Sequence, residues 1–179
     1  MVAFYTSDSI GSPVSGKSKV FCYEIGMMLG VMASKVCEKS YFYTFDTQIR
    51  KEAVSSKSSI LEKVSHSYCG GGTRMSLPFE KMIKDGIKAD RVIIISDNEC
   101  NSSYGWSRKP VQALADEYRR LSGNDIWVHA IDLQGYGTQQ FHGAKTNIIA
   151  GWSEKVLEFI KLAEQGEGTL EKTIEQYTY

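Results

Sequence analysis

The most constraining feature of the sequence is the run RVIIIS at Arg91–Ser96, in which four β-branched apolar residues follow one another. A strand that is apolar at every position, rather than at every second position, is typical of a parallel sheet buried on both faces. Shorter apolar runs at Val2–Tyr5, Ile126–Leu133 and Thr146–Ala150 predict further strands of this sheet. Both faces of such a sheet must be covered by helices, so the sequence predicts an α/β protein.

The segments between these runs carry helical spacing. Phe21–Val36 repeats apolar residues three and four positions apart, and Gly26 and Gly30 within it predict close packing of this helix on the sheet. Pro78 is compatible with the first turn of another helix, because its missing N–H is not needed there. The other predicted helices are Ser58–Val64, Ser76–Ile87, Pro110–Leu121 and Ser153–Ala163.

One pair of segments departs from the alternation of strand and helix. Ser40–Asp46 alternates aromatic and polar residues, and Gln48–Val54 follows it closely enough to be its hairpin partner. The predicted fold is therefore a Rossmann-like, doubly wound, mostly parallel sheet with one antiparallel edge strand and helices on both faces. We expect one domain over residues 1–165, followed by a polar tail or short helix at 166–179.

The charge balance and the cysteines exclude several classes of protein. Lys plus Arg and Asp plus Glu number 21 each, so the formal net charge of zero gives no general attraction to nucleic acid or membrane surfaces. No apolar stretch is long enough to span a membrane, and the N-terminus does not resemble a signal peptide. The four cysteines form no CxxC pair, which disfavours a zinc site. We therefore expect a cytoplasmic protein with reduced thiols.

Three loops are predicted to meet at the carboxyl edge of the sheet, where open α/β sheets bind their ligands. We call them the rim: Thr6–Ser12, Gly70–Arg74 and Asp97–Glu99. Hydroxyl oxygens and a carboxylate gathered from three loops suit a hard divalent cation such as Mg²⁺. The predicted metal ligands are Ser7, Ser9, Thr73 and Asp97.

The rim resembles the metal-ion-dependent adhesion site of von Willebrand factor A domains. That site reads Asp-x-Ser-x-Ser, then a Thr on the second loop and an Asp on the third. Here the matching residues are Tyr5-Thr6-Ser7-Asp8-Ser9, Thr73 and Asp97. The sequence is most similar to the A domain of TROVE (Ro autoantigen) proteins, through Gly71–Thr73, Ser76–Pro78, Ser96–Glu99 and Ala115–Arg120. This resemblance covers about residues 1–163.

The sequence departs from the family at the rim. Tyr5 stands in place of the first aspartate, Asp8 in place of a glycine, and Arg74 follows Thr73 where TROVE proteins often carry an aspartate. Loss of a carboxylate and gain of an inward-pointing cation would both weaken cation binding. Ligand contacts are predicted for Tyr5, Asp8, Arg74, Asn98, Glu99 and His142.

Each of these residues also has an ordinary structural interpretation. Tyr5 could pack in the core, Ser7 and Ser9 could hold their loop by local hydrogen bonds, and Asp8 could form a simple ion pair with Arg74. His129, inside a predicted strand, is interpreted as a packed histidine.

The resemblance implies a binding module that engages a protein or small-molecule ligand through the rim, with a carboxylate of the partner completing the shell of any bound cation. In full-length Ro proteins a ring of helical repeats binds RNA. That ring has no counterpart in this sequence, so we expect no RNA binding from this domain alone.

Two other functions stay open at this point. The rim could be repurposed or engineered to hold a different metal or a small molecule, or to act as a weak hydrolase through Ser7 or Ser9 and a histidine. Alternatively, Gly11–Ser18 (GSPVSGKS) formally matches the phosphate loop of nucleotide-binding proteins. Pro13 within this loop, and a strand that ends as early as Tyr5, disfavour the nucleotide hypothesis. We assign no catalytic residue.

Overall fold

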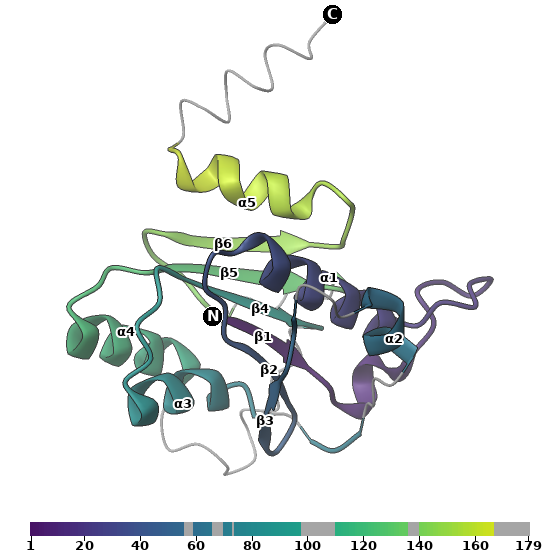
Figure 1. Cartoon of the computed structure of the whole chain (residues 1–179), viewed down its shortest axis with the longest axis horizontal. Coiled ribbons are helices and arrows are strands. Elements are labelled where there is room, and N and C mark those ends of the chain that lie inside the picture. Colours follow the sequence, from purple (N-terminus) through teal and green to yellow (C-terminus); the bar gives the residue numbers. More distant parts are fainter. Residues whose placement is uncertain (56–58, 66–69, 73, 98–109, 136–139, 167–179) are drawn as a thin grey trace, which may run out of the picture.

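The computed structural model describes residues 1–55, 59–65, 70–72, 74–97, 110–135 and 140–166. Its sheet has six strands in the order β3-β2-β1-β4-β5-β6 (Figure 1). The strands are β1 (Val2–Tyr5), β2 (Phe42–Phe45), β3 (Ile49–Glu52), β4 (Arg91–Ser96), β5 (Trp127–Asp132) and β6 (Thr146–Ala150). All pair in parallel except β3, which lies antiparallel to β2 at one edge. The predicted sheet is thus confirmed, including its antiparallel edge strand.

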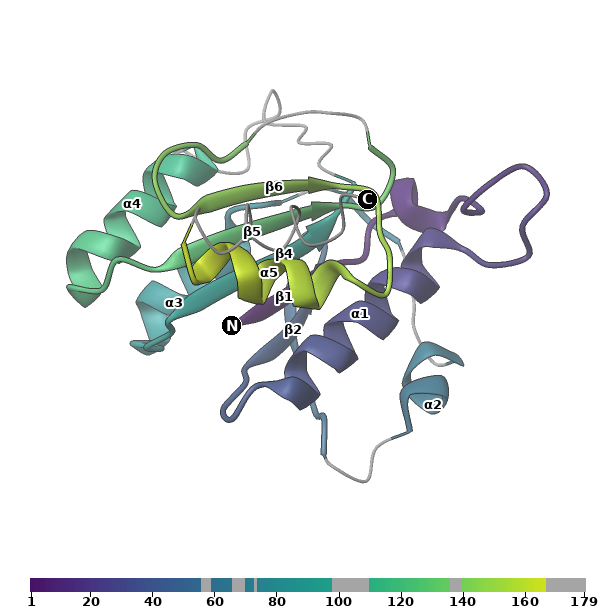
Figure 2. The ribbon, with the colours of Figure 1, turned by 90° about the horizontal axis from the view of Figure 1, so that it is seen from above.

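The helices cover both faces of the sheet, as the sequence predicted. They are α1 (Cys22–Val36), α2 (Ile60–Ser65), α3 (Leu77–Asp85), α4 (Val111–Ser122) and α5 (Val156–Glu164), with a short 3-10 helix, η1 (Asp8–Gly11). Helices α1 and α5 lie on one face of the sheet, whereas α3 and α4 lie on the other (Figures 1 and 2). None of the helices in the described part of the chain is long and apolar enough to cross a membrane. Apart from Gly166, the predicted tail lies outside the described residues.

Helix α1 approaches the sheet through its two glycines. A Cβ atom added to Gly26 would overlap the ring of Phe4 on β1, and one added to Gly30 would lie 2.6 Å from Cζ of Phe42 on β2. Both rings are almost fully buried. The glycines therefore allow two aromatic side chains to fill the space between helix and sheet, and their cost in helix propensity of about 1 kcal/mol each is offset by this packing.

A polar network interrupts the apolar core on the α5 side. His129 on β5 is fully buried, with Nε2 2.9 Å from Oε1 of Glu164 and Nδ1 3.1 Å from the side-chain amide nitrogen of Asn147. The other oxygen of Glu164 lies 2.6 Å from the Arg91 guanidinium. Because the Asn147 amide can only donate, Nδ1 accepts and the ring proton resides on Nε2, which donates to Glu164. His129 is therefore a neutral, packed histidine that ties the end of α5 to the sheet.

We predict that Gly26→Ala destabilises the protein, although alanine favours helix. The added methyl group must displace the Phe4 ring, and overpacking of this kind costs about 1–3 kcal/mol, which exceeds the gain in helix propensity. The free energy of unfolding, measured with urea, should fall. Phe4→Leu, which removes part of the ring, should recover stability in the Gly26→Ala background but lower it in the parent chain. Equal effects of Phe4→Leu in both backgrounds would contradict the contact.

The second prediction concerns pH. Burial lowers the pKa of His129 even though Glu164 acts to raise it. Below about pH 6.5 the unfolded chain therefore binds a proton that the folded chain does not, and the free energy of unfolding should fall as the pH is lowered from about 7.5 to 5. His129→Gln keeps one donor and one acceptor but cannot titrate, so its stability should depend less on pH. The difference between the two proteins isolates His129 from other groups, and identical slopes would contradict the prediction.

Candidate functional site

The carboxyl edge of the sheet brings Ser7, Ser9 and Asp97 into one region. Strands β1 and β4 are parallel neighbours, with Phe4 paired to Ile95, so Asp97 lies level with the start of the loop that follows β1. Ser7 is almost fully buried, and its hydroxyl oxygen lies 2.6 Å from that of Ser9. Asp97 is fully buried at the end of β4. The strand register thus places the starts of the first and third rim loops side by side at this edge.

The loop that carries the serines is held from both sides. On the β2 side, the Gly70 amide donates to the Thr6 carbonyl at 2.7 Å, and the Asp8 amide lies 3.5 Å from the Gly71 carbonyl. On the β5 side, the side-chain amide of Gln134 donates to the Ser9 carbonyl at 2.9 Å and to the Ser12 hydroxyl at 3.0 Å. These bonds fix the backbone around the serine pair, so the hydroxyls are positioned before any ligand arrives.

Two further aspartates, Asp46 and Asp132, lie at the same edge. Asp46 directly follows β2, Asp132 is the last residue of β5, and both are buried. One oxygen of Asp132 accepts the backbone amides of Gln134 and Gly135 at 3.1 and 2.8 Å. Neither residue was predicted from the sequence as a member of this edge. The sequence did contain a signal for them, because each aspartate stands at the carboxyl end of a strand, in the way that Asp97 follows the run RVIIIS.

Asp46 is engaged by its own loop. Its carboxylate accepts the Gln48 amide at 2.7 Å and the Arg50 guanidinium at 2.8 Å. Burial alone would raise the pKa of Asp46, but the hydrogen bonds from Arg50, Gln48 and Thr47 outweigh burial and hold the pKa below its usual value. Asp46 is therefore an ionised residue that orders the turn between β2 and β3. It also supports the second rim loop, because its carbonyl accepts the Arg74 amide at 3.2 Å.

The residues that depart from the family pattern take up three different positions. Tyr5 is fully buried in the core, where its ring packs 5.5 Å from that of Phe45. Asp8 is exposed. The Arg74 guanidinium lies 2.7 Å from the Glu80 carboxylate on α3, so Arg74 forms its ion pair with Glu80 and not with Asp8. This pairing largely neutralises the positive charge that Arg74 brings to the second loop.

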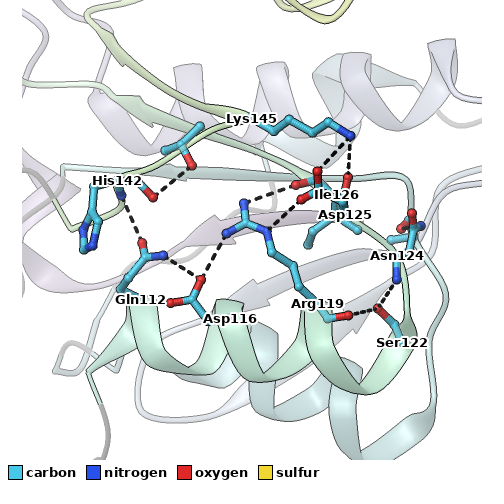
Figure 3. A network of polar contacts seen from close by, with 11 residues as sticks. Gln112, Asp116, Arg119, Ser122, Asn124, Asp125, Ile126, His142 and Lys145 are labelled. Atoms are coloured by element: carbon cyan, nitrogen blue, oxygen red, sulfur yellow. Dashed lines mark hydrogen bonds and ion pairs between the residues drawn. The ribbon is translucent and has the colours of Figure 1, made fainter.

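Of the remaining predicted ligand residues, only His142 lies in the described part of the chain. Thr73, Asn98 and Glu99 lie outside the described residues. His142 lies beside α4, where its backbone amide donates to the Gln112 side chain at 3.0 Å (Figure 3). The described contacts of His142 are made by its backbone, and the network around it continues along α4 instead of toward Ser7 and Ser9.

The segment that formally matches a phosphate loop has a different geometry. A phosphate loop turns its backbone amides toward the phosphate and places its lysine at the start of the next helix. Here the amides of Val14 and Ser18 bond internally to the carbonyls of Val20 and Ser15, and α1 begins only at Cys22. Lys17 is exposed on this loop. The geometry is that of a hairpin-like loop, which disfavours the nucleotide hypothesis.

The described residues contain no group of three or more His, Cys, Asp or Glu side chains that could hold a metal ion. A cation at this edge would therefore depend on hydroxyl oxygens as well as on Asp97. Such a mixed set of oxygen ligands suits Mg²⁺ better than a transition metal.

Comparison with known families decides the classification. Residues 1–161 match the model of the Ro60 vWA domain. The chain belongs to this family. The domain is therefore of a ligand- or partner-binding type, and the resemblance to the A domain of TROVE proteins is confirmed.

Solved structures support the same fold. The crystal structure of the Deinococcus radiodurans RO (RSR) protein is similar, with a TM-score of 0.73 and 14% identity over 89% of this chain. Proximal thread matrix protein 1 from the mussel byssus matches with a TM-score of 0.53, 14% identity and 89% coverage. The matches span only 32% and 43% of those two proteins, so the likeness concerns the fold of one part of each. The sequence has no significant match among curated proteins.

Proposed function

We propose that the domain binds a protein or small-molecule partner through the rim, with a weakly held divalent cation between Ser7, Ser9 and Asp97. The cation would have a partly hydrated shell, and a carboxylate of the partner would complete it. Thr73 is proposed as a further ligand from the second loop. The observation that carries this proposal is the serine pair, whose two hydroxyl oxygens lie 2.6 Å apart in a loop held by Gly70 and Gln134.

The spacing of the serine oxygens suits a shared cation. Adjacent oxygen ligands of an octahedral Mg²⁺ ion, each about 2.1 Å from the metal, lie about 3 Å apart. The two hydroxyls would need to separate by only roughly a few tenths of an ångström, exchanging their mutual hydrogen bond for two metal contacts. The hydroxyls are neutral ligands, so Asp97 supplies the negative charge from the described set.

The electrostatics of the rim favour weak cation binding. Where the family has its first aspartate, Tyr5 lies in the core and supplies no charge. A carboxylate about 4 Å from a divalent ion contributes about 2 kcal/mol even at the dielectric constant of water, and more in a protein. Because Arg74 is paired with Glu80, its charge weakens cation binding little beyond this loss. A site with one carboxylate therefore gains much from a second one, which makes an acidic group on the partner the expected ligand.

Mg²⁺ should stabilise the folded protein, and this effect should depend on Asp97. Linkage predicts a gain of about 1.4 kcal/mol in unfolding free energy when Mg²⁺ is present at ten times its dissociation constant. Unfolding would be followed with urea at increasing MgCl₂, against NaCl at matched ionic strength. Asp97→Asn should remove the Mg²⁺ increment whatever it does to the stability without metal. An increment that survives in Asp97→Asn, or is missing from the parent chain, would refute the cation site.

Ser7 and Ser9 provide a second arm of this test. The double variant Ser7→Ala, Ser9→Ala removes both neutral ligands but keeps Asp97, so it should also lose the Mg²⁺ increment. Lys17→Ala is the matched control on the neighbouring loop, because Lys17 is exposed and lies outside the proposed ligand set. It should respond to Mg²⁺ like the parent chain, and Mg²⁺–ATP should add nothing beyond Mg²⁺ alone in either protein.

Restoring the family's first carboxylate should strengthen cation binding at a cost to the fold. Tyr5→Asp places a carboxylate in a fully buried position and removes an aromatic contact with Phe45, so stability without metal should fall by several kcal/mol. Its Mg²⁺ increment should exceed that of the parent chain. Tyr5→Asn, which has the same size but no charge, is the control. Equal Mg²⁺ increments in the two variants would show that position 5 does not face the cation.

A further inference from the structure

The two edges of the sheet are protected very differently. Edge strand β3 carries Arg50, Lys51 and Glu52, and the Glu52 carboxylate accepts the Thr44 hydroxyl at 3.0 Å and pairs with Lys63 at 3.4 Å. Edge strand β6 reads TNIIA and contains no charge and no proline. Charged residues, prolines and bulges are the usual devices that prevent an edge strand from pairing with another chain. Strand β6 has none of these devices, so its edge is suited to pairing.

The hydrogen bonds between β5 and β6 determine which backbone groups of β6 point outward. The Val128 amide donates to the Lys145 carbonyl at 2.9 Å, and the Gly151 amide donates to the Asp132 carbonyl at 2.7 Å. Since backbone groups alternate in direction along a strand, the odd-numbered residues of β6 face β5. The N–H and C=O groups of Thr146, Ile148 and Ala150 therefore point away from the sheet. None of these six backbone groups has a hydrogen-bond partner among the described residues.

We propose that two copies of this chain pair through β6, antiparallel to each other, to form one continuous twelve-stranded sheet. In the register that uses every outward-pointing group, Ile148 of one copy lies opposite Ile148 of the other, on the two-fold axis. Thr146 then lies opposite Ala150 of the second copy. Each opposed pair exchanges two N–H···O=C bonds, so three pairs satisfy all the outward amides and carbonyls of both strands.

A second copy fits this edge because the strand is complementary to itself. Lys145, the charged residue next to β6, comes to lie opposite Gly151 of the second copy, so like charges do not meet across the axis. Apolar side chains also lie beside this edge. A hollow of ≈ 370 Å³ between β6 and α5 is lined by Ile149, Trp152 and Phe159, among others, and Trp152 is 40% exposed. A copy paired at β6 would cover this hollow.

The layout of the helices is compatible with such a pair. Strand β6 forms the outer edge of the sheet, with α5 to one side of it and α4 toward the opposite face (Figures 1 and 2). A two-fold axis perpendicular to the sheet would place α5 of both copies on the same face. The partly exposed Phe159 of each copy, which lines the hollow beside β6, would then add contact area to the strand pairing.

Sedimentation velocity of the full chain over a wide range of concentration tests the pairing. The parent chain should show a reversible monomer–dimer equilibrium. Ile148→Pro removes an outward N–H that β5 does not use, so it should fold but remain monomeric. Ile148→Val keeps the N–H and an apolar side chain, and should still dimerise. A parent chain that is monomeric throughout, or an Ile148→Pro variant that folds and still dimerises, would overturn the proposal.

Cross-linking tests the register and does not depend on how well the proline variant folds. Directly opposed Cα atoms in a hydrogen-bonded antiparallel pair lie about 5.5 Å apart, within the range of a disulfide. Under mild oxidation Ile148→Cys should therefore form covalent dimers faster than the parent with its native cysteines. Thr146→Cys is the matched control, because the two copies of residue 146 would lie about 14 Å apart along the seam. Equal rates of cross-linking for the two variants would overturn the proposed register.

Discussion

The central position of β1 is the constraint on which the rest of the molecule depends. This strand pairs in parallel with β2 on one side and β4 on the other, and all four of its residues are buried. Its Phe4 ring occupies the space that Gly26 leaves open on α1. This contact fixes β1 and α1 relative to each other, and these two elements form the two ends of the loop that joins them. The serine pair lies on this loop, so its position is set by the core and not by the rim alone.

The same packing explains how the fold accommodates Tyr5 at the end of β1. An aspartate at the end of β1 would need a cation or hydrogen bonds to tolerate its burial, whereas a tyrosine can pack against Phe45. The end of β1 is therefore part of the hydrophobic core, and in the proposed cation site the negative charge would come from Asp97. In the proposed site, the serine pair would be retained and the ligand would supply further negative charge.

Strands with continuous apolar runs could be predicted from sequence because burial on both faces leaves little ambiguity. The segments Val2–Tyr5 and Arg91–Ser96 have the predicted bounds and are buried almost throughout. Thr146–Ala150 also has the predicted bounds, but the expectation that it would be a buried strand was wrong, because β6 is an edge strand whose residues are half-buried or exposed. The meeting of Ser7, Ser9 and Asp97 followed from topology alone, since parallel strands release their loops at one edge. Side-chain partners could not be predicted in this way. Arg74 pairs with Glu80 because the chain turns directly into α3. The spacing of residues in the sequence does not predict that turn.

The hairpin-like loop at Ser12–Val20 illustrates the limit of pattern matching. Its Gly, Lys and Ser residues have the spacing of a phosphate loop, but a phosphate loop also requires amides that are free to bind an anion. In this chain the Val14 amide is used to close the loop on Val20, and Phe21 pairs with Pro13 before α1 begins. Where the hydrogen bonds go decides the function of the loop, and the sequence alone does not contain this information.

The proposed pairing at β6 has a geometric consequence for the proposed binding at the rim. The parallel strands of one copy all direct their carboxyl ends toward the same edge, and an antiparallel two-fold reverses that direction in the second copy. The two rims would therefore face away from each other, at opposite ends of the continuous sheet. They could not close together on one compact partner. Such a dimer would instead connect two partners, or two acidic sites on one extended partner. Its gain in avidity would then depend on whether the distance between those sites matches the distance between the two rims.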